Sequence, residues 1–211
     1  MQRGDTAAST ILRRGDRTRR MPVVNRAAAA LLLAIAAAPA AASDISGIAR
    51  VIDGDTLAIG DQHIRLDGID APETHQICLD AGGRRWTCGI AARDGLAALI
   101  GGRSVSCMPR GRDRYGRTLA ECSAGGVDLN EAMARRGWAL AYLRYSHRYA
   151  ADEADAREHQ RGLWAGAFIA PWDWRHRNKS TVILGAISVP IDAQAALLAP
   201  APSAGRRPAR Q

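Results

Sequence analysis

The sequence of 211 residues predicts an α+β protein, mainly β, in which a five-stranded barrel has three helices packed on its outside. Two observations carry this prediction. Short runs of β-branched residues bounded by Gly and Asp indicate five strands, and three stretches of helical pattern each stop at a glycine. Their order is three strands, one helix, two strands and two helices, which suits a small barrel with helices outside.

The first three strands are expected to form a meander. Residues 45–52 are rich in β-branched and small residues and end at an Asp-Gly-Asp triplet at 53–55, a strong turn signal. Residues 56–59 and 62–69 follow, joined by a Gly-Asp turn. We interpret this pair as a hairpin.

One helix and a second hairpin come next. Residues 89–100 have spaced apolar residues with Ala between them, and two glycines follow as a stop signal. The segments 104–108 and 115–122 flank the polar, Gly-containing stretch 110–114. This pattern predicts two more antiparallel strands.

Two further helices complete the expected fold. The first covers residues 128–136, with Asp128 as its N-cap and Glu131 as the capping-box partner. The second covers residues 149–161. A glycine directly after each segment is typical of a helix C-terminus.

The chain divides into three regions. Residues 1–42 are interpreted as an N-terminal extension with a signal peptide, residues 43–178 as the folded domain, and residues 179–211 as an Ala/Pro-rich tail expected to be disordered. The stretch 181–191 is unusually apolar for such a tail, and the sequence does not explain it.

The N-terminal region indicates export. Arg26 precedes an uncharged run at 27–38, and three alanines before Ser43 offer a cleavage site after Ala42. The run is short for a membrane span, which needs roughly 20 apolar residues, although an uncleaved anchor is the alternative. We expect a periplasmic or secreted protein that is free of the membrane after cleavage. Met21 is an alternative start for this signal.

The excess positive charge lies in the two ends of the chain. The formal net charge is +8, of which residues 1–42 contribute +5 and residues 179–211 contribute +3. The region 43–178 has 18 basic and 18 acidic residues. A high isoelectric point is therefore no evidence of nucleic-acid binding, and affinity for phosphate must come from local arrangement.

All four cysteines follow the signal. An even count in an exported chain favours disulfides, and the absence of a Cys-x-x-Cys pair argues against structural zinc. Four cysteines allow three connectivities. We favour Cys78–Cys88 and Cys107–Cys122, each of which closes a short loop, and free buried thiols are the alternative.

Acidic residues frame the first hairpin. Asp53 and Asp55 lie at the first turn, and Asp70 and Glu73 follow the third strand. In a three-stranded meander these points return to the same end of the sheet. Carboxylates converging there would repel one another without a cation, and an all-oxygen set favours calcium or magnesium. The alternative is ordinary turn and capping chemistry.

Two arginines accompany these carboxylates. Arg65 lies within the third strand, where its guanidinium needs a partner, and Arg117 follows a polar loop. The guanidinium fork suits phosphate oxygens. Two arginines, a metal and a carboxylate base are the groups that phosphoryl transfer requires.

Three blocks resemble the signatures of the staphylococcal nuclease (thermonuclease) family. They are Val51-Ile52-Asp53-Gly54-Asp55-Thr56, Arg65-Leu66-Asp67-Gly68-Ile69-Asp70-Ala71-Pro72-Glu73-Thr74 and Asp113-Arg114-Tyr115-Gly116-Arg117. They occur in the family's order, and the match spans about residues 45–175. The chain looks most like the secreted or periplasmic proteobacterial branch. The resemblance implies an oligonucleotide-binding (OB) fold, a five-stranded barrel plus three helices.

The resemblance also implies a calcium site. Asp55 and Asp70 would bind Ca²⁺ through their carboxylates, and Ala71 would contribute its backbone carbonyl. Ala71 stands where the best-known member has threonine, but the carbonyl is retained. Asp53 is either a neighbour of the metal site or a turn former.

The implied chemistry is hydrolysis of a phosphodiester. Glu73 would be the general base, and Arg65 and Arg117 would clamp the scissile phosphate. Water attacks phosphorus in line, the 5′-oxygen leaves, and DNA or RNA yields 3′-phosphorylated products. The loop 74–88 departs from the family pattern, which leaves contacts at the substrate edge open.

Further residues are expected to contact the substrate. Tyr115 matches a nucleotide-contacting tyrosine of the family, and Arg114 stands where lysine is usual. Tyr142 and Tyr145 lie near two further ring positions, although they would equally serve as packing. The tryptophans at 138, 164, 172 and 174 are expected to be packing residues.

The main hypothesis is a calcium-dependent nuclease that acts on DNA or RNA as a monomer, with no stable protein partner implied. A non-catalytic OB-fold binding module is the chief alternative, but such modules lose acidic or arginine members of the set. All five members of that set are present here, namely Asp55, Arg65, Asp70, Glu73 and Arg117. A disulfide-stapled barrel that binds oligosaccharide is a third hypothesis, and it requires neither arginine.

Overall fold

The computed structural model describes residues 44–185 and 189–198, which belong to one compact unit. The expected signal peptide and the cleavage after Ala42 lie outside the described residues. Within the described ranges, no helix is long and apolar enough to cross a membrane.

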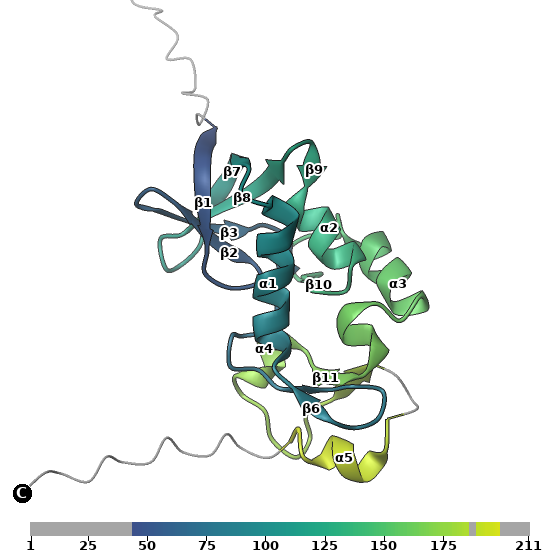
Figure 1. Cartoon of the computed structure of the whole chain (residues 1–211). Helices are drawn as coiled ribbons and strands as arrows, with labels where there is room; N and C mark the ends of the chain where they lie inside the picture. Colours follow the sequence, from purple (N-terminus) through teal and green to yellow (C-terminus); the bar gives the residue numbers. More distant parts are fainter. Residues whose placement is uncertain (1–43, 186–188, 199–211) are drawn as a thin grey trace, which may run out of the picture. The chain divides into compact units, whose positions relative to one another are not determined.

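A closed five-stranded barrel forms the upper part of the unit in Figure 1. Its strands pair antiparallel in the order β3-β2-β1-β7-β8, and a parallel pairing of β3 with β8 closes the ring. The bounds are β1 Ile45–Val51, β2 Thr56–Ile59, β3 Gln62–Leu66, β7 Ser104–Arg112 and β8 Thr118–Ala124, with the short β9 Val127–Asp128 beside β8. The mainly β, five-stranded prediction is confirmed.

Side chains that point inward at every second strand position fill the barrel. Buried and partly exposed residues alternate along β8, so that Ala120, Cys122 and Ala124 point inward. Apolar side chains from the other strands and from the helices meet them in one core, which includes Leu57, Ile64, Leu66, Leu96, Val105, Leu129 and Met133.

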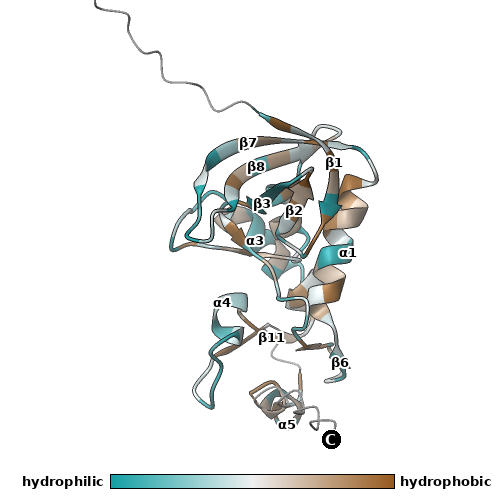
Figure 2. Cartoon of the chain, turned by 90° about the vertical axis from the view of Figure 1, so that its left-hand side faces the viewer, coloured by the Kyte–Doolittle hydropathy of each residue, from teal (hydrophilic) through white to brown (hydrophobic). Residues whose placement is uncertain are grey.

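The three expected helices are present with small changes of bounds. They are α1 Cys88–Ile100, α2 Leu129–Arg135 and α3 Ala150–Glu158. Gly101 ends α1 in the left-handed region, and the Asp128 side chain accepts a hydrogen bond from the Glu131 amide at 3.0 Å as the N-cap of α2. Figure 2 shows α1 lying along the barrel and extending past it toward β6.

The expected third strand is divided in two. β3 ends at Leu66, and the chain then turns through Gly68, which has a φ of 77°. The following residues form β4 Ile69–Asp70, which pairs with β10 Leu140–Ala141 outside the barrel. The prediction of one strand over 62–69 was wrong because the turn at Gly68 redirects the chain.

A second sheet that the sequence did not predict lies at the far end of α1. Figures 1 and 2 both show it below the barrel. Its strands, in the order β12-β11-β5-β6, are Ile183–Gly185, Ala167–Ile169, Cys78–Leu79 and Arg85–Trp86. The 3₁₀ turn Gly162–Ala165 and the short helices α4 Pro171–Trp174 and α5 Ile191–Ala195 accompany it.

Part of the expected disordered tail is therefore ordered. β12 pairs with β11, and Val189 and Leu197 are buried with Ile169 and Trp174. The described part of the apolar stretch 181–191 has its explanation here, because residues 183–185 extend a sheet and Ile183 and Val189 pack into that sheet's core. The prediction was wrong for 179–185 and 189–198, since an Ala/Pro-rich composition did not reveal the partner strand.

Both expected disulfides are present. Cys78–Cys88 joins β5 to the first residue of α1, and Cys107–Cys122 joins residues directly opposite each other on β7 and β8. One bridge therefore fastens the loop after β4 to a helix, and the other lies inside the barrel.

Removing either disulfide should lower stability by about 3 kcal/mol, because loops of 10 and 15 residues regain freedom in the unfolded chain. Paired Cys→Ala variants, unfolded chemically beside the parent protein, measure the difference. If excess reductant leaves the chemical unfolding midpoint of the parent protein unchanged, this result would contradict a stabilising role for the disulfides.

Candidate active site

Asp55 lies directly before β2, and both of its carboxylate oxygens accept hydrogen bonds. The side chain is buried, and Oδ2 accepts a hydrogen bond from the Ala71 amide at 2.9 Å. Oδ1 accepts from the Thr56 hydroxyl at 2.9 Å and from Arg65 Nη1 at 2.6 Å. Asp53 supports the turn, since its Oδ1 accepts from the Asp55 amide at 3.0 Å. The turn before β2 thus holds this carboxylate in one orientation.

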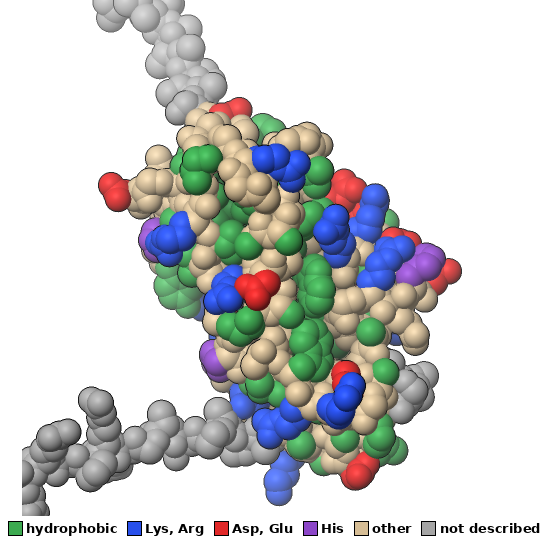
Figure 3. Space-filling model, in the orientation of Figure 1, with side chains coloured by type: hydrophobic (Ala, Val, Ile, Leu, Met, Phe, Trp, Pro, Cys, Tyr) green, Lys and Arg blue, Asp and Glu red, His purple; other side chains and the backbone are tan. Residues whose placement is uncertain are grey.

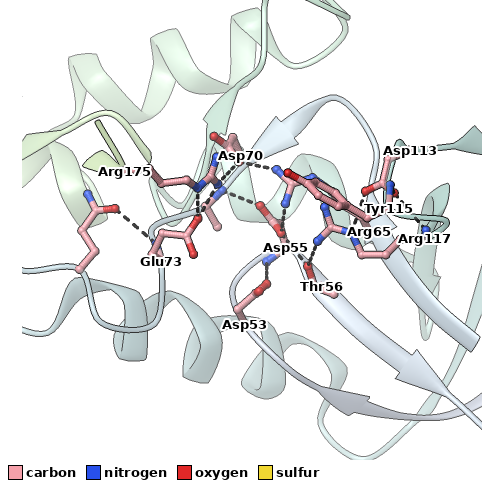
Figure 4. A network of polar contacts seen from close by, with 12 residues as sticks. Asp53, Asp55, Thr56, Arg65, Asp70, Glu73, Asp113, Tyr115, Arg117 and Arg175 are labelled. Atoms are coloured by element: carbon pink, nitrogen blue, oxygen red, sulfur yellow. Dashed lines mark hydrogen bonds and ion pairs between the residues drawn. The ribbon is translucent and has the colours of Figure 1, made fainter. Parts of the chain in front are cut away.

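Arg65 joins Asp55 to Asp70. Its Nη1 contacts Asp55 and its Nη2 contacts Asp70 Oδ1, so one guanidinium bridges two carboxylates that are each 2% exposed. Figure 4 shows Arg65 between them. The sequence-based expectation that an arginine within this strand needs a partner is therefore met by two partners.

These carboxylates carry more negative charge than Arg65 offsets. Burial, and then the charge of Asp55, raises the pKa of Asp70 to about 6. The same two causes raise the pKa of Asp53 to about 6. Burial alone would lower the pKa of Arg65, but the charges of Asp55 and Asp70 outweigh it and raise that pKa. A further cation would relieve this repulsion.

Glu73 follows β4 and meets an arginine that sequence reasoning missed. Arg175, directly after α4, donates from Nε to Glu73 Oε1 at 2.6 Å, and its Nη2 contacts the same oxygen. Nη2 also lies 3.9 Å from Asp70 Oδ1. The residues are 102 positions apart, and no local pattern separates Arg175 from other arginines near the end of the domain.

Arg117 lies on the side of Asp55 and Arg65 that is opposite to Glu73, as Figure 4 shows. Asp113 holds it, because Oδ2 accepts from Arg117 Nε at 2.7 Å and Oδ1 accepts from its amide at 3.0 Å. Nη1 lies 3.4 Å from the Thr56 hydroxyl, which in turn donates to Asp55. Arg117 is thereby connected to the Asp55 carboxylate through Thr56.

Tyr115 is an exposed ring beside these arginines. It is 69% exposed, and the guanidinium carbons of Arg114 and Arg117 lie 4.8 and 5.7 Å from its ring centroid. Arg114 also donates to the Tyr115 hydroxyl at 2.6 Å. An open hollow of about 350 Å³ adjoins this group and is lined by Tyr115, Arg117, Arg112, His63 and Gln62, among others.

Tyr142 and Tyr145 belong to a separate aromatic group. Tyr142 donates its amide to the Gly68 carbonyl, beside β4. Trp172 stacks on Tyr142 at 5.5 Å with an interplanar angle of 7°, and Tyr145 contacts Tyr142 edge-on at 4.8 Å. Trp172 was expected only as packing. In the structure Trp172 also covers one face of the Tyr142 ring. The Tyr145 side chain remains 71% exposed.

The donor set around Arg65 fits a hard cation. Asp55 and Asp70 are buried, oxygen-bearing and mutually repelling, which are the features that Ca²⁺ or Mg²⁺ satisfies. In the described ranges, no group of three or more His, Cys, Asp or Glu side chains is arranged to hold a metal ion. Two carboxylates would therefore need backbone or solvent oxygens to complete a site.

The distribution of charged side chains on one face of the protein is consistent with the absence of net charge in residues 43–178. On the face shown in Figure 3, acidic and basic side chains are interspersed instead of gathered into one basic patch. Positive charge at the site comes from individually placed arginines.

Comparisons with known proteins identify the class. Residues 63–166 match the family described as staphylococcal nuclease homologue. An uncharacterized endonuclease of Escherichia coli O157:H7 is 38% identical over 149 residues, which cover 66% of this chain and 91% of that protein. The succinoglycan biosynthesis protein ExoI of Rhizobium meliloti (strain 1021) is 37% identical over 127 residues, covering 59% and 66%. The probable staphylococcal-like nuclease CAN2 of Oryza sativa subsp. japonica is 34% identical over 120 residues, covering 56% and 30%.

The barrel and these matches together define a nuclease with an OB-fold. The chain belongs to the staphylococcal nuclease family.

Asp70 provides a test of the electrostatics. Its pKa rises from 3.8 to about 6 on folding, so the folded state binds more protons between these values. The stability from this group is present near pH 4 and is lost as the pH rises toward 7 in metal-free protein. We expect the unfolding free energy of the parent protein minus that of Asp70→Asn to fall across this range.

Chemical unfolding at pH 4 and pH 7 measures that difference. Asp94→Asn, on the exposed side of α1, is the matched control. A difference for Asp70→Asn that stays constant between the two pH values would contradict the raised pKa.

Proposed function

We propose that this nuclease is exported, depends on calcium, and cuts DNA or RNA internally to leave 3′-phosphorylated products. The observation that carries the proposal is the bridge from Arg65 to Asp55 and Asp70, with Glu73 on one side and Arg117 on the other. This arrangement supplies every protein group that metal-assisted phosphodiester hydrolysis needs. No contact in the described residues favours the non-catalytic alternative.

Asp55, Asp70 and the backbone carbonyl of Ala71 would hold the calcium ion. The fit rests on two buried carboxylates, since burial and then the charge of Asp55 raise the pKa of Asp70. When bound, the ion would supply positive charge against the phosphate oxygens.

Glu73 is the proposed general base. It removes a proton from a water molecule, the water oxygen forms a bond to phosphorus, and the bond from phosphorus to the 5′-oxygen breaks. The leaving 5′-oxygen takes a proton from solvent, and the phosphate stays on the 3′-oxygen. Glu73 suits this role because its side chain is 29% exposed, whereas Asp55 and Asp70 are buried.

Arg65 and Arg117 are the proposed phosphate clamp. A guanidinium has five N–H donors, and in the described residues Arg65 uses Nη1 and Nη2 for one carboxylate each. Donors therefore remain for phosphate oxygens. Arg117 has its Nε fixed by Asp113, which directs the outer nitrogens toward the site.

Arg114, Tyr115, Tyr142 and Tyr145 are the proposed contacts to the rest of the substrate. Tyr115 and Tyr145 are the exposed rings, and stacking of a base on such a ring contributes about 1–3 kcal/mol. Trp172 covers one face of Tyr142, so we assign Tyr142 to supporting Tyr145 in a shared aromatic surface.

Export is supported by the two disulfides, which persist in oxidising compartments. We propose a periplasmic or secreted location and a monomeric enzyme. Substrate recognition then depends on the site itself, because the body of the protein carries no net charge.

Mature protein should degrade single-stranded DNA with added calcium and stop when a chelator is in excess. End-group analysis of the fragments should find 3′-phosphates. Undiminished cutting in chelator would refute the calcium assignment, and tight binding of DNA without any cutting would favour the binding-module alternative.

Glu73→Gln should lower the turnover number by about 10²–10⁴-fold, because the amide cannot accept the proton from water. The fold should persist, since Gln can keep a hydrogen bond to Arg175. Glu131→Gln, at an exposed pair with Arg135 on α2, is the control with the same chemical change. Equal turnover numbers for the two variants would place the base elsewhere.

A further inference from the structure

Arg175 reaches the active site from the second sheet. It follows α4, and both of its contacts to Glu73 go to the same oxygen, Oε1. In the described part of the chain, no hydrogen bond is made to the other oxygen, Oε2. Figure 4 shows Arg175 extended toward Glu73 beside Asp70. One carboxylate oxygen is thus held while the second can accept a proton.

Glu73 needs such a holder because its own loop gives its side chain little support. The loop backbone is secured, since the Gln76 amide donates to the Glu73 carbonyl at 2.7 Å and the Gln76 side chain accepts from the Glu73 amide at 3.3 Å. The carboxylate itself is partly exposed and near the buried charge of Asp70. Nη2 of Arg175 contacts the Glu73 carboxylate and lies 3.9 Å from Asp70 Oδ1, so its positive charge offsets repulsion between the two carboxylates.

The element that presents Arg175 packs into the core of the second sheet and is hydrogen-bonded to this loop. Gln76 is completely buried and donates from Nε2 to the Ile169 carbonyl of β11 at 2.7 Å. α4 follows β11 after one residue, and Trp174 at its end is buried in the core of the second sheet. The β11–α4 segment therefore fixes the backbone of the Glu73 loop through Gln76 and its carboxylate through Arg175.

We propose that Arg175 is a positioning residue that holds Glu73 through Oε1 and leaves Oε2 to receive the proton from the attacking water. This inference rests on the proposed role of Glu73 as the base. It assigns part of the second sheet to catalysis: that sheet sets the orientation of the base. A direct contact from Arg175 to substrate phosphate is the competing interpretation, since its side chain is 46% exposed.

Turnover and Michaelis constants separate these two roles. For Arg175→Ala acting on a single-stranded oligonucleotide with saturating calcium, we expect kcat to fall about 10- to 100-fold and KM to change less than about threefold, because a displaced base slows chemistry without weakening binding. Arg175→Lys should recover part of kcat through a single ammonium contact. Arg84→Ala, which removes an exposed arginine at the tip of the β5–β6 hairpin, should match the parent enzyme.

A double-mutant cycle then tests whether Arg175 acts through Glu73. In the Glu73→Gln background, single-turnover rates should show less than about a twofold further loss from Arg175→Ala. An equal loss in both backgrounds, or a rise in KM with kcat unchanged, would overturn the positioning role. A fully active Glu73→Gln enzyme would overturn the base assignment and this inference with it, so the two failures are distinguishable.

Thermal unfolding of every variant guards against a merely structural effect. If Arg175→Ala fails to fold, Arg175→Gln takes its place in the cycle, because it keeps N–H donors without the charge. The outcome against the proposal is a fall in kcat that is proportional to the fall in melting temperature, in Arg84→Ala as well as in the Arg175 variants. Lost stability would then explain the lost activity.

Discussion

The guanidinium of Arg65 lies between the carboxylates of Asp55 and Asp70, and the rest of the site depends on this bridge. Two carboxylates buried together repel each other and lose hydration, which is costly unless positive charge compensates them. One arginine faces two carboxylates, and burial together with the charge of Asp55 still raises the pKa of Asp70. The site is thereby both held together and left attractive to a cation.

Closure of the barrel brings the second arginine to this bridge. Arg65 on β3 lies opposite Thr56 on β2 and Leu119 on β8. The parallel pairing of β3 with β8 sets Thr118 opposite Ile64, next to the Thr56–Arg65 pair, and Arg117 directly precedes β8. Its contact with Thr56 is a consequence of that closure. An open sheet of the same strands would leave the two arginines apart.

The second sheet supports the loop that carries Glu73. The Cys78–Cys88 bridge ties this loop to α1, Gln76 ties it to β11, and Arg175 contacts the Glu73 carboxylate. These contacts come from α1 and from the β11–α4 segment, and they converge on one short loop. The described part of the C-terminal segment completes the hydrophobic core beneath them. Elements added outside the barrel thus restrict the freedom of a residue at its edge.

Local patterns in the sequence predicted the order of the barrel strands and the three main helices, favoured the two disulfide pairs among three connectivities, and singled out Asp55, Arg65 and Asp70. Turns, periodicity and short loops act over few residues, so a sequence can reveal them. Tertiary structure alone decided the redirection of the chain at Gly68, the second sheet, the ordering of residues 179–185 and 189–198, and the partnership of Arg175 with Glu73. Two-residue strands have no periodicity to detect, and a contact across 102 positions leaves no trace in either local sequence. Such contacts form only when separately determined elements pack together, since their energy comes from burial and from charges that the folded chain brings within reach.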